Sequence, residues 1–141
     1  MDAIVITGPT ASGKSDLSSK LAELIDGEII SADSAQVYRG LDIGTAKPER
    51  IVQDKLKHHL LDIRDPNDIY TVADFRTDAL RIVNEIQSRG KMPIISGGTM
   101  LYLKALREGL ADLPAANPLV RDSIKAEALK HGWAKIHTDL K

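Results

Sequence analysis

The sequence predicts an α/β fold, a three-layer sandwich in which helices cover both faces of a parallel sheet. Short apolar runs rich in β-branched residues alternate with longer segments of helical periodicity. A glycine-rich turn joins the first apolar run to the first helical segment. The 141 residues are 43% hydrophobic and 28% charged, which suits one soluble core, so we expect a single domain over residues 1–141.

Four apolar runs are the predicted strands. Residues 3–7 form the first, predicted to be buried, and residues 28–31 form the second. Residues 59–63 form a third, and residues 92–96 form a fourth that ends at Gly97-Gly98. In an open parallel sheet, ligands bind beyond the carboxyl ends of the strands. We therefore look for functional residues directly after these runs.

The first predicted helix follows the glycine-rich turn and ends at Asp26-Gly27. Its apolar residues recur at helical spacing and predict the face that packs on the sheet. They are Leu17, Leu21, Leu24 and Ile25. Residues 38–50 contain two glycines and Pro48, which predicts a loop followed by a helix.

A long amphipathic helix is predicted to begin at Thr71, where Asp74 completes a capping box, and to end near Gly90. Its apolar positions are Val72, Phe75, Ala79, Ile82 and Ile86. The remaining predicted elements are a helix over residues 99–108, a helix from Asn117-Pro118 to His131 that ends at Gly132, and an element that begins at Trp133.

The composition excludes several classes of site. With no cysteine, the chain has no disulfide, thiolate zinc site or cysteine nucleophile, which agrees with a cytoplasmic location. No apolar run reaches the roughly 18 residues of a membrane helix, and the first residues lack a basic region, so we expect neither a membrane partner nor a signal peptide. Because the net charge is −1, any RNA contact must come from a local basic patch or from contacts to single bases.

Residues 8–15 match the pattern GxxxxGK[ST] in full, between a predicted strand and a predicted helix. Backbone amides of such a loop surround phosphate oxygens, and the amino end of the following helix adds its positive dipole. Lys14 adds a mobile charge, and the Ser15 hydroxyl is a candidate Mg²⁺ ligand. The residues predicted to bind a diphosphate or nucleotide are Gly8, Pro9, Thr10, Ala11, Ser12, Gly13, Lys14 and Ser15.

This loop makes the predicted sandwich P-loop NTPase-like. It predicts a bound phosphate chain but not the molecule that carries it, because pyrophosphate esters and nucleoside triphosphates fit the same loop. The alternative is a glycine-rich turn without a ligand.

Asp33 follows the second predicted strand, so we expect it beside the P-loop at the ligand-binding edge of the sheet. A carboxylate there is suited to take a proton from an attacking amine or hydroxyl. An aspartate that caps a turn is an equally good interpretation of the position alone.

Four blocks in order resemble tRNA dimethylallyltransferases, over nearly the whole chain. They are the P-loop variant Pro9-Thr10-Ala11-Ser12, residues 31–48 (SADSAQVYRGLDIGTAKP), residues 58–62 (HHLLD) and residues 97–102 (GGTMLY). Members of this family continue with the rest of a catalytic core and with much of a tRNA-binding surface. The resemblance therefore implies the N-terminal part of a longer architecture.

The resemblance implies transfer of a dimethylallyl group from dimethylallyl diphosphate to N6 of the adenosine 3′-adjacent to the anticodon in tRNA. The P-loop would hold the diphosphate with Mg²⁺, Asp33 would be the base, and Thr99 would lie near the reacting centre. The residues implied to contact tRNA are Asp33, Ser34, Ala35, Gln36, Thr99 and Arg121. The Gln36 amide is suited to pair with an adenine edge. We expect a cytoplasmic monomer whose partners are the tRNA anticodon loop and dimethylallyl diphosphate.

Three other functions stay open. A small-molecule kinase of the shikimate or nucleotide type shares the P-loop and the aspartate, but its arginine-rich lid is not evident, since Arg107 and Arg121 are the only arginines after Lys91. An adenylate isopentenyltransferase performs the same chemistry on a free nucleotide. An inactive phosphate-binding fragment is the third.

Several of these residues also have plainer interpretations. Thr99 is suited to cap the helix that follows it, Gln36 to sit in an exposed turn, and Arg121 to lie on a solvated helix face. Adjacent His58 and His59 suggest a metal site, but neighbours on a strand point to opposite faces, so we expect no zinc there.

Overall fold

The computed structural model describes residues 2–111 and 117–140. Contacts divide the chain into two compact units, Met1–Leu110 and Ala111–Lys141, and each is described by itself. The single domain over residues 1–141 stays a prediction.

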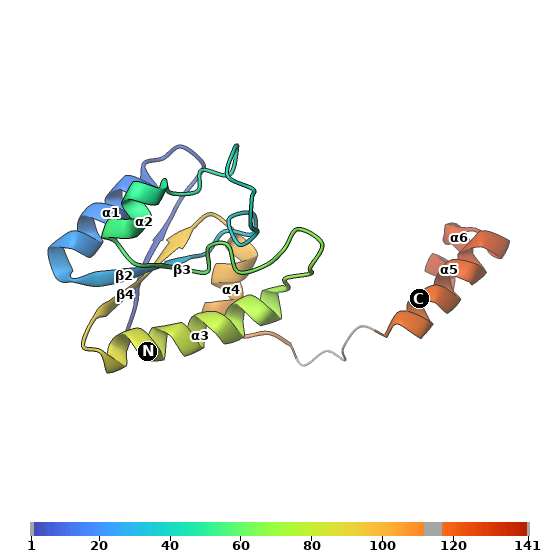
Figure 1. Ribbon diagram of the computed structural model, residues 1–141. Helices are drawn as coiled ribbons and strands as arrows, with labels where there is room; N and C mark the ends of the chain where they lie inside the picture. The colour runs from blue at the N-terminus through green and yellow to red at the C-terminus, as the bar shows by residue number, and fades with distance from the viewer. Residues whose placement is uncertain (1, 112–116, 141) are drawn as a thin grey trace. The chain divides into compact units, whose positions relative to one another are not determined.

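The first unit is built on four parallel strands in the order β1–β4–β2–β3, as far as the structure describes the chain (Figure 1). The strands are β1 (Ile4–Thr7), β2 (Gly27–Ser31), β3 (His58–His59) and β4 (Met92–Gly97). β4 is the central link, because Ile94 pairs with Ile4 of β1 on one side and with Ile29 of β2 on the other. The predicted α/β fold with a parallel sheet is confirmed.

Helices cover both faces of this sheet. Helices α1 (Lys14–Ile25) and α2 (Arg50–Lys55) lie on one face, and α3 (Val72–Ser88) and α4 (Met100–Glu108) lie on the other (Figure 1). Because successive strand residues point to opposite faces, β2 and β4 supply both cores. Ile29 and Ile94 pack with Ala22 of α1, whereas Ile30 and Ile95 pack with Phe75 of α3.

The long helix α3 forms as predicted. Thr71 and Asp74 make the reciprocal bonds of a capping box, and the helix then buries Phe75, Ala79, Ile82, Val83 and Ile86. The ring of Phe75 stacks on Tyr102 of α4, with ring centroids 4.1 Å apart. This stack joins the two helices of that face.

Burial differs from the prediction in two places. Val5 of β1 is 52% exposed, because α3 on its face packs over β2 and β4. On α1, Leu21 and Ile25 pack against the core as predicted, whereas Leu17 and Leu24 are 56% and 81% exposed. The helix also buries Ser18 and Ala22, whose small side chains allow it to lie close to the sheet. Ser18 Oγ donates to the Lys14 carbonyl (2.7 Å) and lies 2.6 Å from Ser96 Oγ of β4.

The third strand is shorter than the predicted residues 59–63. It ends at His59, because Leu60 and Asp62 have positive φ angles of 63° and 54°. The chain then runs beside the segment after β2, where the amide of Ile63 donates to the carbonyl of Val37 (2.9 Å). This turn places the Asp62 carboxylate against the loop that begins at Tyr38.

The second unit contains α5 (Pro118–His131) and α6 (Trp133–Asp139), separated by Gly132. The Asn117 side chain accepts hydrogen bonds from the amides of Leu119 and Val120, so the predicted start of α5 is confirmed. Across residues 2–111 and 117–140, no helix has both the length and the apolarity needed to cross a bilayer.

The carboxyl ends of β2 and β4 approach each other very closely. The Ala32 amide donates to the Ser96 carbonyl (2.8 Å), and the Thr99 amide donates to the Ala32 carbonyl (3.2 Å). A Cβ atom on Gly97 would lie 2.2 Å from the Ala32 carbonyl oxygen, which no side chain tolerates. Gly97 therefore permits the contact that places Asp33 next to the β4–α4 turn.

We expect Gly97→Ala to lower the free energy of unfolding by about 2 to 3 kcal/mol, because the backbones of β2 and β4 must separate. Urea denaturation measures this change. Gly98→Ala is the matched control, since a Cβ there meets its nearest neighbour, the Gly8 carbonyl oxygen, at 3.8 Å. Equal stability of the two variants would contradict the role given to Gly97.

Candidate active site

The P-loop is a curled turn between β1 and α1. Ala11 and Gly13 have φ angles of 62° and 82°, and the Ser12 amide donates to the Pro9 carbonyl (3.3 Å). Gly13 is the left-handed N-cap residue from which α1 begins at Lys14. The Lys14 ammonium donates to the same Pro9 carbonyl (2.6 Å), so its side chain folds back over the loop.

A cavity of about 690 Å³ lies at the carboxyl ends of the strands, and it brings the P-loop and Asp33 together. Residues 10–15 line one side, and Asp33, Ala35 and Gln36 line another. Segment 44–46 of the following loop, with Pro48 and Glu49, also lines the cavity. Of the predicted site residues in this unit, Gly8, Pro9, Ser34 and Thr99 do not line the cavity, although they adjoin residues that do.

Asp33 both holds a turn and faces the cavity, so its two interpretations are compatible. Its Oδ1 atom accepts hydrogen bonds from the amides of Ala35 (2.8 Å) and Gln36 (3.3 Å). Within the described part of the chain, Oδ2 has no hydrogen-bond partner, and the side chain is half-buried at the cavity wall. One oxygen thus fixes the position of the carboxylate while the other can accept a proton.

Thr99 precedes α4, but its side chain makes no capping bond there, so that interpretation is wrong. Its Oγ1 atom instead accepts a hydrogen bond from the Ser34 amide (3.0 Å). Together with the bond from the Thr99 amide to Ala32, this contact ties the β4–α4 turn to the turn that holds Asp33.

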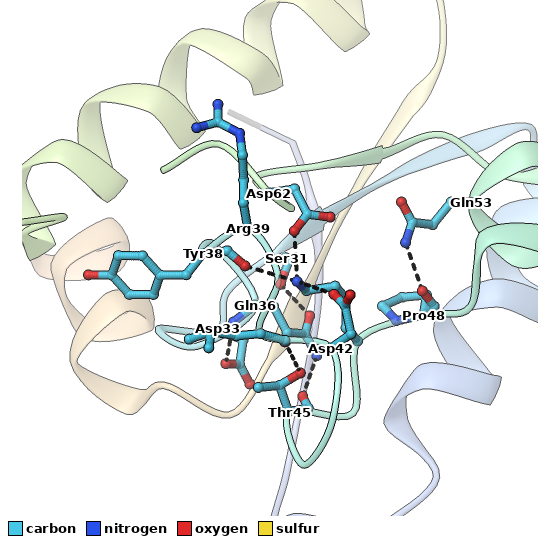
Figure 2. A network of polar contacts seen from close by, with 12 residues as sticks. Ser31, Asp33, Gln36, Tyr38, Arg39, Asp42, Thr45, Pro48, Gln53 and Asp62 are labelled. Atoms are coloured by element: carbon cyan, nitrogen blue, oxygen red, sulfur yellow. Dashed lines mark hydrogen bonds and ion pairs between the residues drawn. The ribbon is translucent and has the colours of Figure 1, made fainter. Parts of the chain in front are cut away.

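The Gln36 amide is fully engaged inside the protein (Figure 2). Ser31 Oγ donates to its Oε1 atom (2.8 Å), and its Nε2 atom donates to the carbonyls of Thr45 (3.0 Å) and Ala46 (3.1 Å). Gln36 is therefore a half-buried anchor of the loop, and the expected exposed turn glutamine is wrong. Pairing with an adenine edge would require the loop to give up these bonds.

Lys47 is a buried charge in this loop that does not line the cavity, and no sequence pattern singled it out. Its side chain is 3% exposed. The ammonium donates to the Tyr38 carbonyl (2.9 Å), to Asp42 (2.8 Å) and to Asp62 (2.7 Å), which gather around one point in Figure 2. Burial opposes the charge, but the bonds to Asp42 and Asp62 outweigh it and raise the pKa of Lys47.

The two adjacent histidines have separate partners. His58 lines the cavity, its Nδ1 atom lies 2.7 Å from the Leu56 carbonyl, and burial lowers its pKa. His59 contacts the buried carboxylate of Glu28 through Nε2 (2.7 Å), and Arg89 donates to the same oxygen (2.8 Å). Burial alone would raise the pKa of Glu28, but these two bonds outweigh it and lower the pKa.

Arg121 lies exposed on α5 in the second unit. Its implied contact with RNA stays a prediction.

The fold and the site define the class of protein. A parallel α/β sandwich with this phosphate loop after its first strand is P-loop NTPase-like. The family model described as IPP transferase matches residues 36–141. The chain therefore belongs to the IPP transferase family.

Curated relatives agree with this assignment. The chain is 54% identical over 137 residues to the tRNA dimethylallyltransferase of Bordetella avium, which covers 97% of this chain and 44% of that protein. The enzyme of the same name from Bordetella petrii is 51% identical over 137 residues, which again cover 97% of this chain and 44% of that protein. The chain thus spans less than half the length of these relatives.

Solved structures share the fold. The tRNA isopentenylpyrophosphate transferase of Bacillus halodurans superimposes with a TM-score of 0.76 and 41% identity, over 99% of this chain and 46% of that one. A eukaryotic dimethylallyltransferase acting on tRNA has a TM-score of 0.76 and 34% identity, over 86% of this chain and 31% of that one.

We expect Thr99→Val to lower the free energy of unfolding by about 1 kcal/mol, because the Ser34 amide loses its acceptor. Thr99→Ser keeps the hydroxyl and is the matched control. Urea denaturation and hydrogen exchange at the Ser34 amide measure the effect. Unchanged exchange in Thr99→Val would show that this bond does not hold the Asp33 turn.

Proposed function

We propose that this chain carries the diphosphate site and the base of an enzyme that transfers a dimethylallyl group from dimethylallyl diphosphate to N6 of the adenosine 3′-adjacent to the anticodon in tRNA. The observation that carries the proposal is the shared cavity, because P-loop residues 10–15 and the Asp33 carboxylate line the same space. The relatives that share this chain's segment are named for dimethylallyl or isopentenyl transfer to tRNA, which fits that chemistry.

The reaction needs a base on one side of the allylic carbon and a stabilised leaving group on the other. The N6 nitrogen forms a bond to the allylic carbon while the bond from that carbon to the diphosphate oxygen breaks. The leaving diphosphate takes the electron pair, and Asp33 takes the proton from N6. Donors around the diphosphate stabilise the negative charge that develops on it.

The P-loop residues suit the leaving group. The Lys14 ammonium and the amino end of α1 are positive and lie at the cavity. The Ser15 hydroxyl also lines the cavity and, among the described residues, has no hydrogen-bond partner, so it fits a Mg²⁺ ion beside a diphosphate. Such an ion would neutralise part of the leaving-group charge.

An adenine base must leave its stack to reach a carboxylate on a cavity wall. The turn that holds Asp33 is continuous with Ser34, Ala35 and Gln36, so it would also lie against the flanking nucleotides. The net charge of −1 fits recognition by shape and single bases better than recognition by a broad basic surface.

We expect Asp33→Asn to lower the rate of transfer at least about 100-fold, because the amide cannot take the proton. The asparagine oxygen can still accept the two turn bonds, so folding and diphosphate binding should persist. Asp33→Ala removes both the base and the acceptor of the two turn bonds. Comparison of the two variants therefore distinguishes the loss of the base from the loss of the turn. Transfer by Asp33→Asn at the unaltered rate would contradict the assignment of the base.

The assay follows label from dimethylallyl diphosphate with Mg²⁺ into unmodified tRNA or into AMP. Because the chain spans 44% of the Bordetella avium relative, it is assayed alone and as a chimera in which it replaces the matching segment of that relative. Label in tRNA supports the proposal, and label in AMP indicates an adenylate isopentenyltransferase. Phosphate transfer from ATP to a small acceptor indicates a kinase. No label transfer by either protein contradicts the proposal.

A further inference from the structure

One wall of the cavity is a loop without an apolar anchor at its tip. Segment 44–46, with Pro48 and Glu49, lines the same cavity as residues 10–15. Leu41 and Ile43, the large apolar residues of this loop, are 41% and 99% exposed. Burial of apolar area therefore contributes little to its position, and polar contacts must hold it.

Three side chains supply these contacts. The Gln36 amide holds the carbonyls of Thr45 and Ala46. Lys47 joins the start of the loop, at the Tyr38 carbonyl, to Asp62 after β3. Gln53 Nε2 donates to the Pro48 carbonyl (2.7 Å), and Figure 2 shows all of these contacts on the one loop.

Lys47 makes the strongest of these contacts. Its bonds are charge-assisted, and its ammonium is shielded from water, since the side chain is 3% exposed. Asp62 is the shielded partner at 29% exposure, whereas Asp42 is 69% exposed. Removal of the ammonium would leave the Asp62 carboxylate without its cation, and the neutral contacts of Gln36 and Gln53 would be left to hold the loop.

We propose that Lys47 is a positioning residue: it holds segment 44–46 as a wall of the cavity shared with the P-loop, and this wall confines the organic part of a diphosphate substrate beside Asp33. The inference rests on the proposed function, because it takes the P-loop ligand to be a prenyl diphosphate. It predicts that Lys47 governs affinity for the prenyl group and leaves affinity for the diphosphate group to the P-loop.

Isothermal titration calorimetry of the chain with dimethylallyl diphosphate and with inorganic diphosphate tests this inference. In Lys47→Met, which keeps the length of the side chain and removes the charge, affinity for dimethylallyl diphosphate should fall about tenfold, roughly the contribution of two buried methylene groups. Affinity for inorganic diphosphate should stay within about twofold, because the P-loop is unchanged. The ¹⁵N order parameters of the amides of residues 41–46 should fall relative to the unaltered chain, because the segment becomes more mobile.

Two controls separate positioning from folding. Lys55→Met removes an exposed lysine of α2 that does not line the cavity, and it should change neither affinity. Asp62→Asn keeps the lysine and weakens its shielded partner, so it should shift the same quantities in the same direction by less. An equal fall in the affinities for dimethylallyl diphosphate and for inorganic diphosphate would overturn the inference, because it would show only a structural role for Lys47. An unchanged affinity for both ligands would overturn it as well.

The absence of cysteine in the chain permits a chemical rescue. Lys47→Cys, alkylated in urea with 2-bromoethylamine and refolded, regains an ammonium at nearly the original length. This protein should recover the preference for dimethylallyl diphosphate. The same variant alkylated with iodoacetamide carries a neutral group and should not recover it. Equal behaviour of the two adducts would overturn the role of the charge.

Failure of the proposed function gives a different result. The unaltered chain would then bind dimethylallyl diphosphate no better than inorganic diphosphate, or would bind neither. The ¹⁵N order parameters still decide the role of Lys47 in that case. Lower order parameters of residues 41–46 in Lys47→Met would show that Lys47 holds the wall and that only the substrate is wrong, whereas unchanged order parameters would overturn the role of Lys47 in holding the loop.

Discussion

The close approach of β2 and β4 at their carboxyl ends is the constraint on which the site depends. Gly97 has no side chain, so the Ala32 carbonyl can lie where a Cβ would otherwise be. This contact sets Asp33 and Thr99 side by side although 65 residues separate their segments. The P-loop follows β1, which pairs with the other side of β4. The central strand β4 therefore sets the positions of both the phosphate loop and the carboxylate.

The parts of the structure that local sequence determines were predictable. Helix α3 has its capping box and its apolar period within one continuous segment, so burial and boundaries agree with the sequence. The P-loop is likewise a continuous pattern. Asp33 could be placed because the carboxyl ends of parallel strands share one edge. In each case, the prediction needs only residues that are neighbours in the chain, or the rule that the carboxyl ends of parallel strands meet at one edge of the sheet.

The rest depends on contacts between distant segments. The apolar period of α1 favours its leucines, but the sheet accepts the face with Ser18 and Ala22 because Ser96 lies opposite. Leu60 and Asp62 end β3 through positive φ angles that their residue types do not predict.

Lys47 is of a residue type that usually lies on the surface. It is buried only because the loop that begins at Tyr38 packs against Asp62. The plainer interpretation of Thr99, a helix cap, is wrong because its side chain accepts a bond from another segment.

The bond between the Lys14 ammonium and the Pro9 carbonyl bears on selectivity. The cation already has an acceptor within its own loop, so an incoming anion must compete with a carbonyl that is held in place. A singly charged anion such as acetate offers little more than that carbonyl. Two linked phosphoryl groups offer several negative oxygens at once and can draw the ammonium away while the loop amides bind the remainder. In the proposed function, this contact within the loop would favour ligands that carry several negative oxygens over weak anions.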